Sequence, residues 1–339
     1  MSSILVVNAG STSLKLSAVD EGEQSRKLGS LEKAPRDVVA VGHRVVHGGP
    51  RFRAPVVLND DTLADLRSLV GLAPLHNAPA LAAIDEARAA FPELPHIAVF
   101  DTEFHATLPE EASTYAVPER WRSVWHIRRY GFHGLAVQWA AEQVPVERLI
   151  VCHLGGGCSV SAVRDGRSID TTMGFSPLDG VPMATRAGSL DAAAILYLLR
   201  SGAAALDEID SVLERESGLL GLSGLSGSVA ELERATAPAA RRALDLYCYR
   251  IACAAGSLAV ALGGLDAIAF SGGVGEGSAF VRSEVCGRLG VLGVRLDDER
   301  NRAVTVPAEI AAGDSKVRVS VVHAREDVVA ARAVRRVLG

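Results

Sequence analysis

The chain has 339 residues, 48% hydrophobic and 22% charged, with a formal net charge of −5 at pH 7. This is the composition of a globular protein, and the length exceeds a single ordinary core, so we expect two domains and no extensive disorder. Because the chain has no basic stripe and only 5% aromatic residues, we expect no nucleic-acid partner.

The cysteines and the apolar segments indicate a cytoplasmic protein without a membrane anchor. The five cysteines are odd in number and include no CxxC pair, which argues against a disulfide framework and against a zinc site. The N-terminus lacks the basic region and apolar core of a signal peptide. The most apolar tract, 251–265, is short and contains Gly and Ser, so it predicts a buried helix over residues 239–262 rather than a membrane span.

The stretch ILVVNAGSTSLKLSAVD, residues 4–20, predicts two strands joined by a turn. The turn combines a side-chain amide, several hydroxyls and a lysine, a set that suits phosphate. If the second strand begins at Ser11, alternation predicts a phosphate face with Ser11, Ser13 and Lys15 and a core face with Leu14 and Leu16.

A second stretch resembles the first. LIVCHLGGGCSVSAVRDG, residues 149–166, aligns with residues 4–22 when one residue is dropped, and in both the second strand ends Ser-Ala-Val. This repeat predicts two related domains that face each other. Between the two hairpins, Asp101 follows the apolar run HIAVF, at the C-terminal end of a predicted strand, where the sites of α/β proteins concentrate.

A third glycine segment, 265–290, predicts a buried strand, a loop over Gly272–Gly277 and a helix whose first N–H groups suit an anion. Residues 328–339 predict an amphipathic helix whose apolar side carries Val328, Ala331, Val334 and Val337. The alternation of strands and helices predicts α/β architecture. The sequence contains no P-loop, protein-kinase catalytic loop or dinucleotide fingerprint.

Ten short motifs follow one another along the chain: VVNAGSTSLK (6–15), GHRVVHGG (42–49), LAPLHNAPAL (72–81), VFDTEFHATLP (99–109), RRYGFHG (128–134), CHLGGG (152–157), DTTMGFSPLDG (170–180), ATRAGSLD (184–191), SGLLGLSGLS (217–226) and FSGGVGEGS (270–278). These motifs and their order resemble the acetate kinase family of carboxylate kinases. The resemblance implies two duplicated actin-like, ribonuclease H-like α/β domains with an active-site cleft between them. It assigns residues 1–105 and 328–339 to the first domain. Residues 106–327 form the second, with the nucleotide site and the interface of a homodimer.

The family's activity implies reversible, magnesium-dependent phosphoryl transfer from ATP to acetate, giving acetyl phosphate and ADP. The resemblance implies four catalytic residues, namely Arg44, Asp101 as the acid, His133 as the stabiliser of the transition state, and Arg186. The carboxylate substrate would contact Arg44, Val46, Leu75, His76, Phe132 and Pro177. The nucleotide would contact Ser11, Ser13, Lys15, His153, Leu154, Gly155, Gly156, Gly157, Ser228, Val229, Ala230, Gly273, Val274, Gly275, Glu276 and Gly277. Mg²⁺, or Mn²⁺, would be held by Asn8 and Glu326.

Elementary chemistry makes these roles reasonable. Phosphoryl transfer needs alignment and neutralisation of charge more than covalent help. Here an anionic carboxylate must approach a polyphosphate, and two arginines with a magnesium ion offset that repulsion. The planar guanidinium grips a carboxylate or phosphate through two parallel hydrogen bonds. Magnesium prefers hard oxygen ligands and keeps several waters, so a sparse protein ligand set is sufficient.

Three alternatives stay open on the sequence. A propionate or butyrate kinase would differ only in pocket volume, and one methylene contributes only about 1–3 kcal/mol. Ser228 and Ala230 stand where the family has an aspartate and an arginine near the nucleoside, so GTP or pyrophosphate would also serve as donor. A non-catalytic nucleotide-sensing protein would keep the fold, but the retained catalytic set argues against it.

Overall fold

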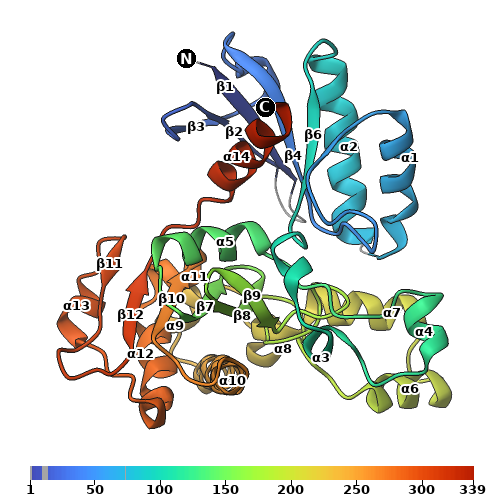
Figure 1. Cartoon of the computed structure of the whole chain (residues 1–339). Coiled ribbons are helices and arrows are strands. Elements are labelled where there is room, and N and C mark those ends of the chain that lie inside the picture. Colours follow the sequence, from blue (N-terminus) through green and yellow to red (C-terminus); the bar gives the residue numbers. More distant parts are fainter. Residues whose placement is uncertain (1, 10–13, 73) are drawn as a thin grey trace.

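The computed structural model describes residues 2–9, 14–72 and 74–339, and for residues 74–76 only the backbone. Two six-stranded sheets organise the described residues (Figure 1). The first sheet contains β1 (Ser3–Ala9), β2 (Leu14–Val19), β3 (Ser25–Leu28), β4 (Val38–Val45), β5 (Val56–Val57) and β6 (His96–Phe100). The second contains β7 (Arg148–Leu154), β8 (Cys158–Arg164), β9 (Arg167–Thr171), β10 (Ala267–Ser271), β11 (Ala308–Glu309) and β12 (Arg318–Val321).

The two sheets have the same topology, which confirms the predicted duplication. Their strand orders are β3-β2-β1-β4-β6-β5 and β9-β8-β7-β10-β12-β11. In each sheet a three-stranded antiparallel meander is followed by two parallel strands and a short antiparallel edge strand. The chain therefore has the predicted α/β fold of two duplicated halves.

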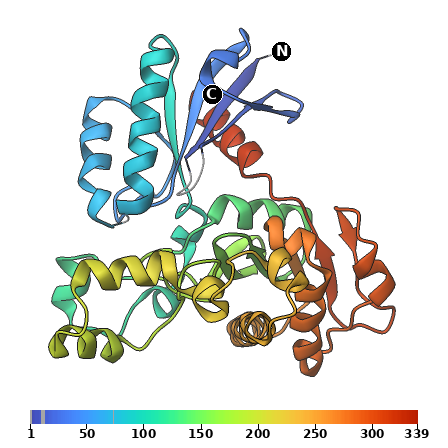
Figure 2. The same cartoon turned by 180° about the vertical axis from the view of Figure 1, so that it is seen from behind.

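Helices cover both faces of the first sheet. The helices of the first half are α1 (Asp60–Ser68), α2 (Pro74–Ala90) and α14 (Glu326–Leu338). Helix α2 contacts β1 and β4 on one face, and α14 contacts β1, β4 and β6. Apolar residues of α14 join those of the strands in one buried cluster, so the C-terminal helix returns to the sheet in which the chain begins. Figures 1 and 2 show both termini near this sheet.

The second half contains the remaining helices. They are α3 (Glu110–Ser113), α4 (Glu119–Ser123), α5 (Gly134–Gln143), α6 (Ala192–Ser201), α7 (Leu206–Ser211), α8 (Gly218–Ser223), α9 (Val229–Arg234), α10 (Pro238–Leu262), α11 (Gly272–Gly277), α12 (Ala279–Arg288) and α13 (Asp298–Arg302). Helix α10 is apolar and long enough to cross a membrane, but half of its most apolar window is buried inside the protein. Its buried residues form the largest core with β7, β8 and β10, so it is the buried helix that the sequence predicted.

Two local predictions differ from the structure. Leu14, predicted to face the core, is 46% exposed, whereas Leu16 is buried. Leu14 pairs with Ala9 at the end of the hairpin where the two strands are connected, and it is not part of the apolar cluster that Leu16 joins. Residues 10–13, and with them the predicted strand start at Ser11, lie outside the described residues.

The second difference is that Gly272–Gly277, predicted as a loop, is the short helix α11. Glycine has a low helix propensity, so tertiary contacts override the local preference here. The fully buried Arg282 donates from Nη1 to the carbonyl oxygens of Gly275 and Glu276, 2.9 Å in each case. It also donates to Asn301, so one guanidinium fixes the end of α11.

Candidate active site

Arg44 lies at the centre of the candidate site. Strands β4 and β6 are parallel neighbours, so their carboxyl ends bring Arg44 and Asp101 to the same edge of the sheet. Arg44 donates from Nε to Asp101 Oδ1 at 2.8 Å and from Nη2 to Oδ2 at 2.5 Å. The two side chains are only 13% and 1% exposed. The pair is therefore a nearly buried, two-point ion pair of the kind that fixes a guanidinium in one orientation.

Asn8 and Glu326 extend this network. Asn8 lies beside Arg44 on the parallel strand β1, and its Oδ1 accepts a hydrogen bond of 2.9 Å from Arg44 Nη1. Asn8 Nδ2 donates to Glu326 Oε2 at 3.0 Å, and Arg44 Nη1 lies 3.7 Å from the same oxygen. Glu326 is the first residue of α14, so residues more than 300 positions apart meet at one point.

Burial raises and positive charge lowers the pKa of each of the two carboxyl groups in this network, and the net shift differs between them. Burial raises the pKa of Asp101, and the Arg44 guanidinium offsets this only in part. For Glu326, burial also works to raise the pKa, but Arg44, His153 and Asn8 together hold it below its usual range. Glu326 is therefore ionised at neutral pH and supplies a hard oxygen anion at the edge of the cluster.

Two histidines from the second half face this cluster. The rings of His133 and His153 lie 4.8 Å apart, and His153 Nε2 is 3.9 Å from Glu326 Oε1. Burial lowers the pKa of both rings, and the positive charge of Arg44 lowers it further, although Glu326 acts in the opposite direction on His153. Both imidazoles are neutral at pH 7, so each has one N–H donor and one acceptor nitrogen.

Buried serines hold these rings. Ser159 Oγ lies 3.1 Å from His133 Nδ1, and Ser271 Oγ lies 3.0 Å from His153 Nδ1. Both serines are 0% exposed. A serine hydroxyl can donate to Nδ1 or accept from it, so these serines hold the orientation of each ring in either tautomer and leave Nε2 directed at the site.

The segment after β6 connects the cluster around Arg44 to the two histidines. His133 has a left-handed backbone, with φ of 59°, directly before helix α5. The backbone N–H of Gly134 donates to the carbonyl oxygen of Asp101 at 2.9 Å. A Cβ on Gly134 would lie 2.2 Å from that oxygen, so only glycine allows this approach.

Arg186 enters from a loop of the second half. Its Nε donates to Glu214 Oε2 at 2.9 Å, and the two side chains are 13% and 12% exposed. A Cβ on Gly157 would lie 3.2 Å from His133 Nε2 and 3.6 Å from Arg186 Nη1, so both side chains flank this glycine. The turn between β7 and β8 thus lies close to both the second arginine and the histidine.

The predicted carboxylate pocket is partly described. Val46 and Phe132 are buried, 5% and 0% exposed, in the same apolar cluster. The His47 ring packs edge-on against Phe132, with centroids 5.2 Å apart. Pro177 is also buried. The side chains of Leu75 and His76 lie outside the described residues.

The predicted nucleotide residues fall into separate groups. Ser11 and Ser13 lie outside the described residues, and Lys15 is exposed on β2 opposite Asn8. Residues 155–157 form the turn after His153 and Leu154, and α11 contains Gly273, Val274, Gly275, Glu276 and Gly277.

Glu276 and Ser228, both predicted nucleotide contacts, also form hydrogen bonds within the protein. Glu276 accepts from the backbone N–H of Ala324 at 3.1 Å and lies 2.8 Å from His323 Nδ1. Ser228 caps α9, because its Oγ accepts from Glu231 N at 3.4 Å. Val229 is 4% exposed and Ala230 is exposed.

The sequence analysis did not identify Glu214, Ser159, Ser271 and Arg282. Ser159 and Ser271 each follow a glycine segment or precede one, but a serine there also reads as an ordinary turn residue. Glu214 lies 28 residues from Arg186 in the sequence, and no spacing rule connects them.

The assembled side chains are suited to a reaction between two anions. Two guanidinium groups, two neutral imidazoles and a low-pKa carboxylate converge from both halves of the chain. Within the described ranges, no group of three or more His, Cys, Asp or Glu side chains could hold a metal ion by itself. The oxygens of Asn8 and Glu326 instead form a sparse, hard donor set. Such a set fits a magnesium ion that takes its other ligands from phosphates and water.

Comparison with known proteins gives consistent results. A model of the acetokinase family matches residues 26–332. The chain is 49% identical to an acetate kinase of Deinococcus radiodurans over 294 residues, 84% of this chain and 74% of that protein. It is 46% identical to an acetate kinase of Deinococcus deserti over 325 residues, 92% of this chain and 81% of that protein.

Solved structures agree in fold. A propionate kinase of Francisella tularensis superimposes with a TM-score of 0.91 at 33% identity, over 98% of this chain and 99% of that one. An acetate kinase of Porphyromonas gingivalis superimposes with a TM-score of 0.87 at 28% identity, over all of both chains.

Proposed function

The chain belongs to the acetokinase family, and from that premise we propose that it transfers the γ-phosphoryl group of ATP reversibly to acetate, giving acetyl phosphate and ADP. The observation that supports this best is the cluster around Arg44, which joins residues from β1, β4, β6 and α14 beside His133, His153 and Arg186.

The two arginines carry the main electrostatic task. The acetate carboxylate and the γ-phosphate repel each other, and the transition state spreads negative charge over the equatorial oxygens. Arg44 holds the carboxylate, and Arg186 contacts the phosphoryl group in transfer. Each guanidinium is fixed by a carboxylate, Asp101 or Glu214, so little reorganisation is needed when charge develops.

We assign Asp101 the role of orienting Arg44 rather than that of a general acid. Both of its oxygens accept hydrogen bonds from Arg44, so the carboxylate holds that guanidinium at two points. His133, neutral and held through Nδ1, presents Nε2 to the phosphoryl oxygens when the proton resides there.

A divalent cation completes the charge balance. Asn8 and Glu326 would hold Mg²⁺, which would supply positive charge to offset that of the polyphosphate. The nucleotide would lie along the turn 155–157, helix α11 and the start of α9, with Lys15 and the residues of the first hairpin near its phosphates.

We further propose that the first domain of the chain comprises residues 1–105 and 328–339. We also propose that the protein is a cytoplasmic homodimer. Helix α6 is apolar, yet it contains no buried residue, and Leu196 and Tyr197 on it are 45% and 69% exposed. Trp121 on α4 and Trp125, which follows α4, are 40% and 56% exposed, and α4 and α6 lie at the same end of the second half (Figure 1). A second copy that covers this surface would remove the apolar groups from water.

The test is an assay of ADP release with a panel of carboxylates. The purified enzyme is mixed with MgATP and acetate, propionate or butyrate, and ADP is followed with coupling enzymes. We expect the highest kcat/KM with acetate. ADP release that does not depend on any carboxylate, or a kcat/KM for butyrate above that for acetate, would contradict the proposal.

A further inference from the structure

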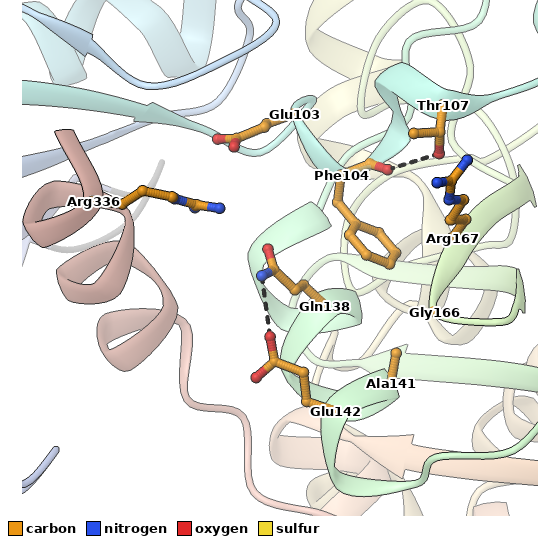
Figure 3. A pocket seen from close by; sticks show the side chains of 9 residues that line it. All are labelled: Glu103, Phe104, Thr107, Gln138, Ala141, Glu142, Gly166, Arg167 and Arg336. Carbon is orange, nitrogen blue, oxygen red and sulfur yellow. Dashed lines mark hydrogen bonds between the residues drawn. The ribbon is translucent and has the colours of Figure 1, made fainter.

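A cavity outside the proposed active site lies at the junction of the two halves. Its volume is about 380 Å³, within the range of small-ligand sites. Its walls come from the connector after β6, helix α5, the start of β9 and helix α14 (Figure 3). Helix α14 packs on the first sheet and β9 belongs to the second, so the cavity spans both halves. None of its lining residues belongs to the cluster around Arg44.

Glu103 contributes an oxygen without a partner to this wall. Its Oε2 is buried and forms no hydrogen bond with any residue of the described part of the chain. Burial raises the pKa of Glu103 to about 7, although Arg336 acts in the opposite direction. Buried polar atoms without a partner are rare in native proteins, so the site has room for a group that Glu103 can bind.

Two arginines from different halves border the same space. Figure 3 shows Arg336 extending from α14 toward Glu103, and Arg167 beside Phe104 on the other side of the cavity. Among the residues that the structure describes, neither guanidinium forms an ion pair. The other acidic wall residue, Glu142, pairs with Arg332 on α14, which also pairs with Glu23. Arg167 and Arg336 are therefore the two cations that the wall offers to a ligand.

We propose that this cavity binds a short dicarboxylate, with one carboxylate on Arg336, the other on Arg167, and the intervening carbons over the Phe104 ring. Two cations on separate walls call for two separate anionic groups rather than one compact anion. Protonated Glu103 donates its O–H to the nearer ligand carboxylate. No covalent step is involved.

Bound there, the ligand joins α14 to β9 and limits movement between the two halves. Glu103 lies two residues after Asp101 on the same connector, which is tied to α5 through the hydrogen bond from Gly134 N to the Asp101 carbonyl oxygen. Closure of a cleft before phosphoryl transfer needs such movement, so occupancy lowers kcat. This kinetic consequence rests on the proposed function, whereas the binding itself does not.

Calorimetric titration with succinate tests the binding, on enzyme saturated with MgADP and acetate so that the active site is filled. We expect saturable binding that is about 10–100-fold weaker in Arg336→Gln and in Arg167→Gln, since each loses one charge-assisted contact. Arg26→Gln, which changes an exposed arginine on β3, is the matched control and keeps the affinity of the native chain. Absence of binding, or equal affinity in all three variants, would overturn the proposal. Inorganic phosphate binding more tightly with the same dependence on both arginines would overturn the dicarboxylate class.

Two further readouts separate this site from the active site. The charged groups that face Glu103 are Arg336 on α14, Arg167 on β9 and Glu142 on α5. Succinate affinity should rise as pH falls from about 8 to about 6.5, as Glu103 gains its proton, and this rise should vanish in Glu103→Gln.

Succinate should lower kcat at saturating acetate. Inhibition purely competitive with acetate would place succinate in the active site and overturn the proposal. If the chain showed no kinase activity, the calorimetric result would still stand.

Discussion

Asp101→Asn tests the role of the ion pair most sharply. The change keeps the size of the side chain, removes its charge and turns one acceptor into an amide donor facing Arg44 Nη2 or Nε. One of the two hydrogen bonds of 2.8 and 2.5 Å is therefore lost, and Arg44 keeps no full counter-charge nearer than Glu326 at 3.7 Å. Removing one partner of a buried pair costs about 3–5 kcal/mol of unfolding free energy, and the retained hydrogen bond places the expected cost near the lower end.

The effect on catalysis should be larger than the effect on stability. A misdirected Arg44 removes one preorganised donor from the transition state, which typically lowers kcat by about 10²–10³. Nucleotide affinity should change little, because the nucleotide residues lie on other elements. The assays are steady-state acetyl phosphate formation, nucleotide titration and urea unfolding.

Asp266→Asn is the matched control for this variant. Asp266 pairs with Arg148 at 2.6 Å, but the two side chains are 30% and 34% exposed. Such a pair contributes about 0–1 kcal/mol, and kcat should stay at the native value. The reasoning would be refuted if Asp101→Asn kept kcat within about threefold, or if nucleotide binding collapsed while turnover of the bound enzyme stayed normal.

Three further predictions concern the Arg186–Glu214 pair and two buried histidines. Arg186→Ala should lower kcat by about 10²–10³ with unchanged thermal melting, and a loss below about threefold would remove Arg186 from the site. Glu214→Ala should lower kcat strongly and Glu214→Gln less, because glutamine keeps an acceptor for Arg186 Nε; equal kcat in both variants would show that Glu214 does not position Arg186. Burial lowers the pKa of His47 and of His105 to about 4, below the unfolded value, so the unfolded chain binds more protons as pH falls from about 6.5 to about 4. The urea midpoint should therefore fall across this window, and a flat midpoint would show that these rings do not stay neutral in the fold.

Much of the fold was accessible from the sequence because its signals are local. The long apolar helix was expected at 239–262 and is found at Pro238–Leu262, since its composition and flanking turns both indicate a helix. The duplication was visible because both hairpins carry the same strand-turn-strand pattern, and the paired strands confirm it. The glycine run 272–277 was misjudged because its helix depends on Arg282, which contacts it from the following helix.

Some residues of the candidate site were likewise predictable from local sequence motifs, and others were not. Four site residues lie at strand ends or at a helix start, namely Asn8, Arg44, Asp101 and Glu326. Each belongs to a short sequence motif that can be recognised without the structure. Their contact follows from the parallel register of β1, β4 and β6 and from the return of α14. Glu214 and the two serines beside the histidines depend on tertiary packing between distant segments. The unpartnered Oε2 of Glu103 depends on burial, which no residue pattern reveals.

The central claim is that the acetate carboxylate attacks the γ-phosphoryl group directly while Arg44 and Arg186 neutralise the charge. The measurement is phosphorus NMR of the products formed from MgATP and acetate labelled with ¹⁸O in both oxygens. We expect ADP together with acetyl phosphate that carries ¹⁸O in the oxygen bridging carbon and phosphorus, seen as an isotope shift of the phosphorus resonance. Label appearing in AMP, or ADP and free phosphate without acetyl phosphate, would contradict the account.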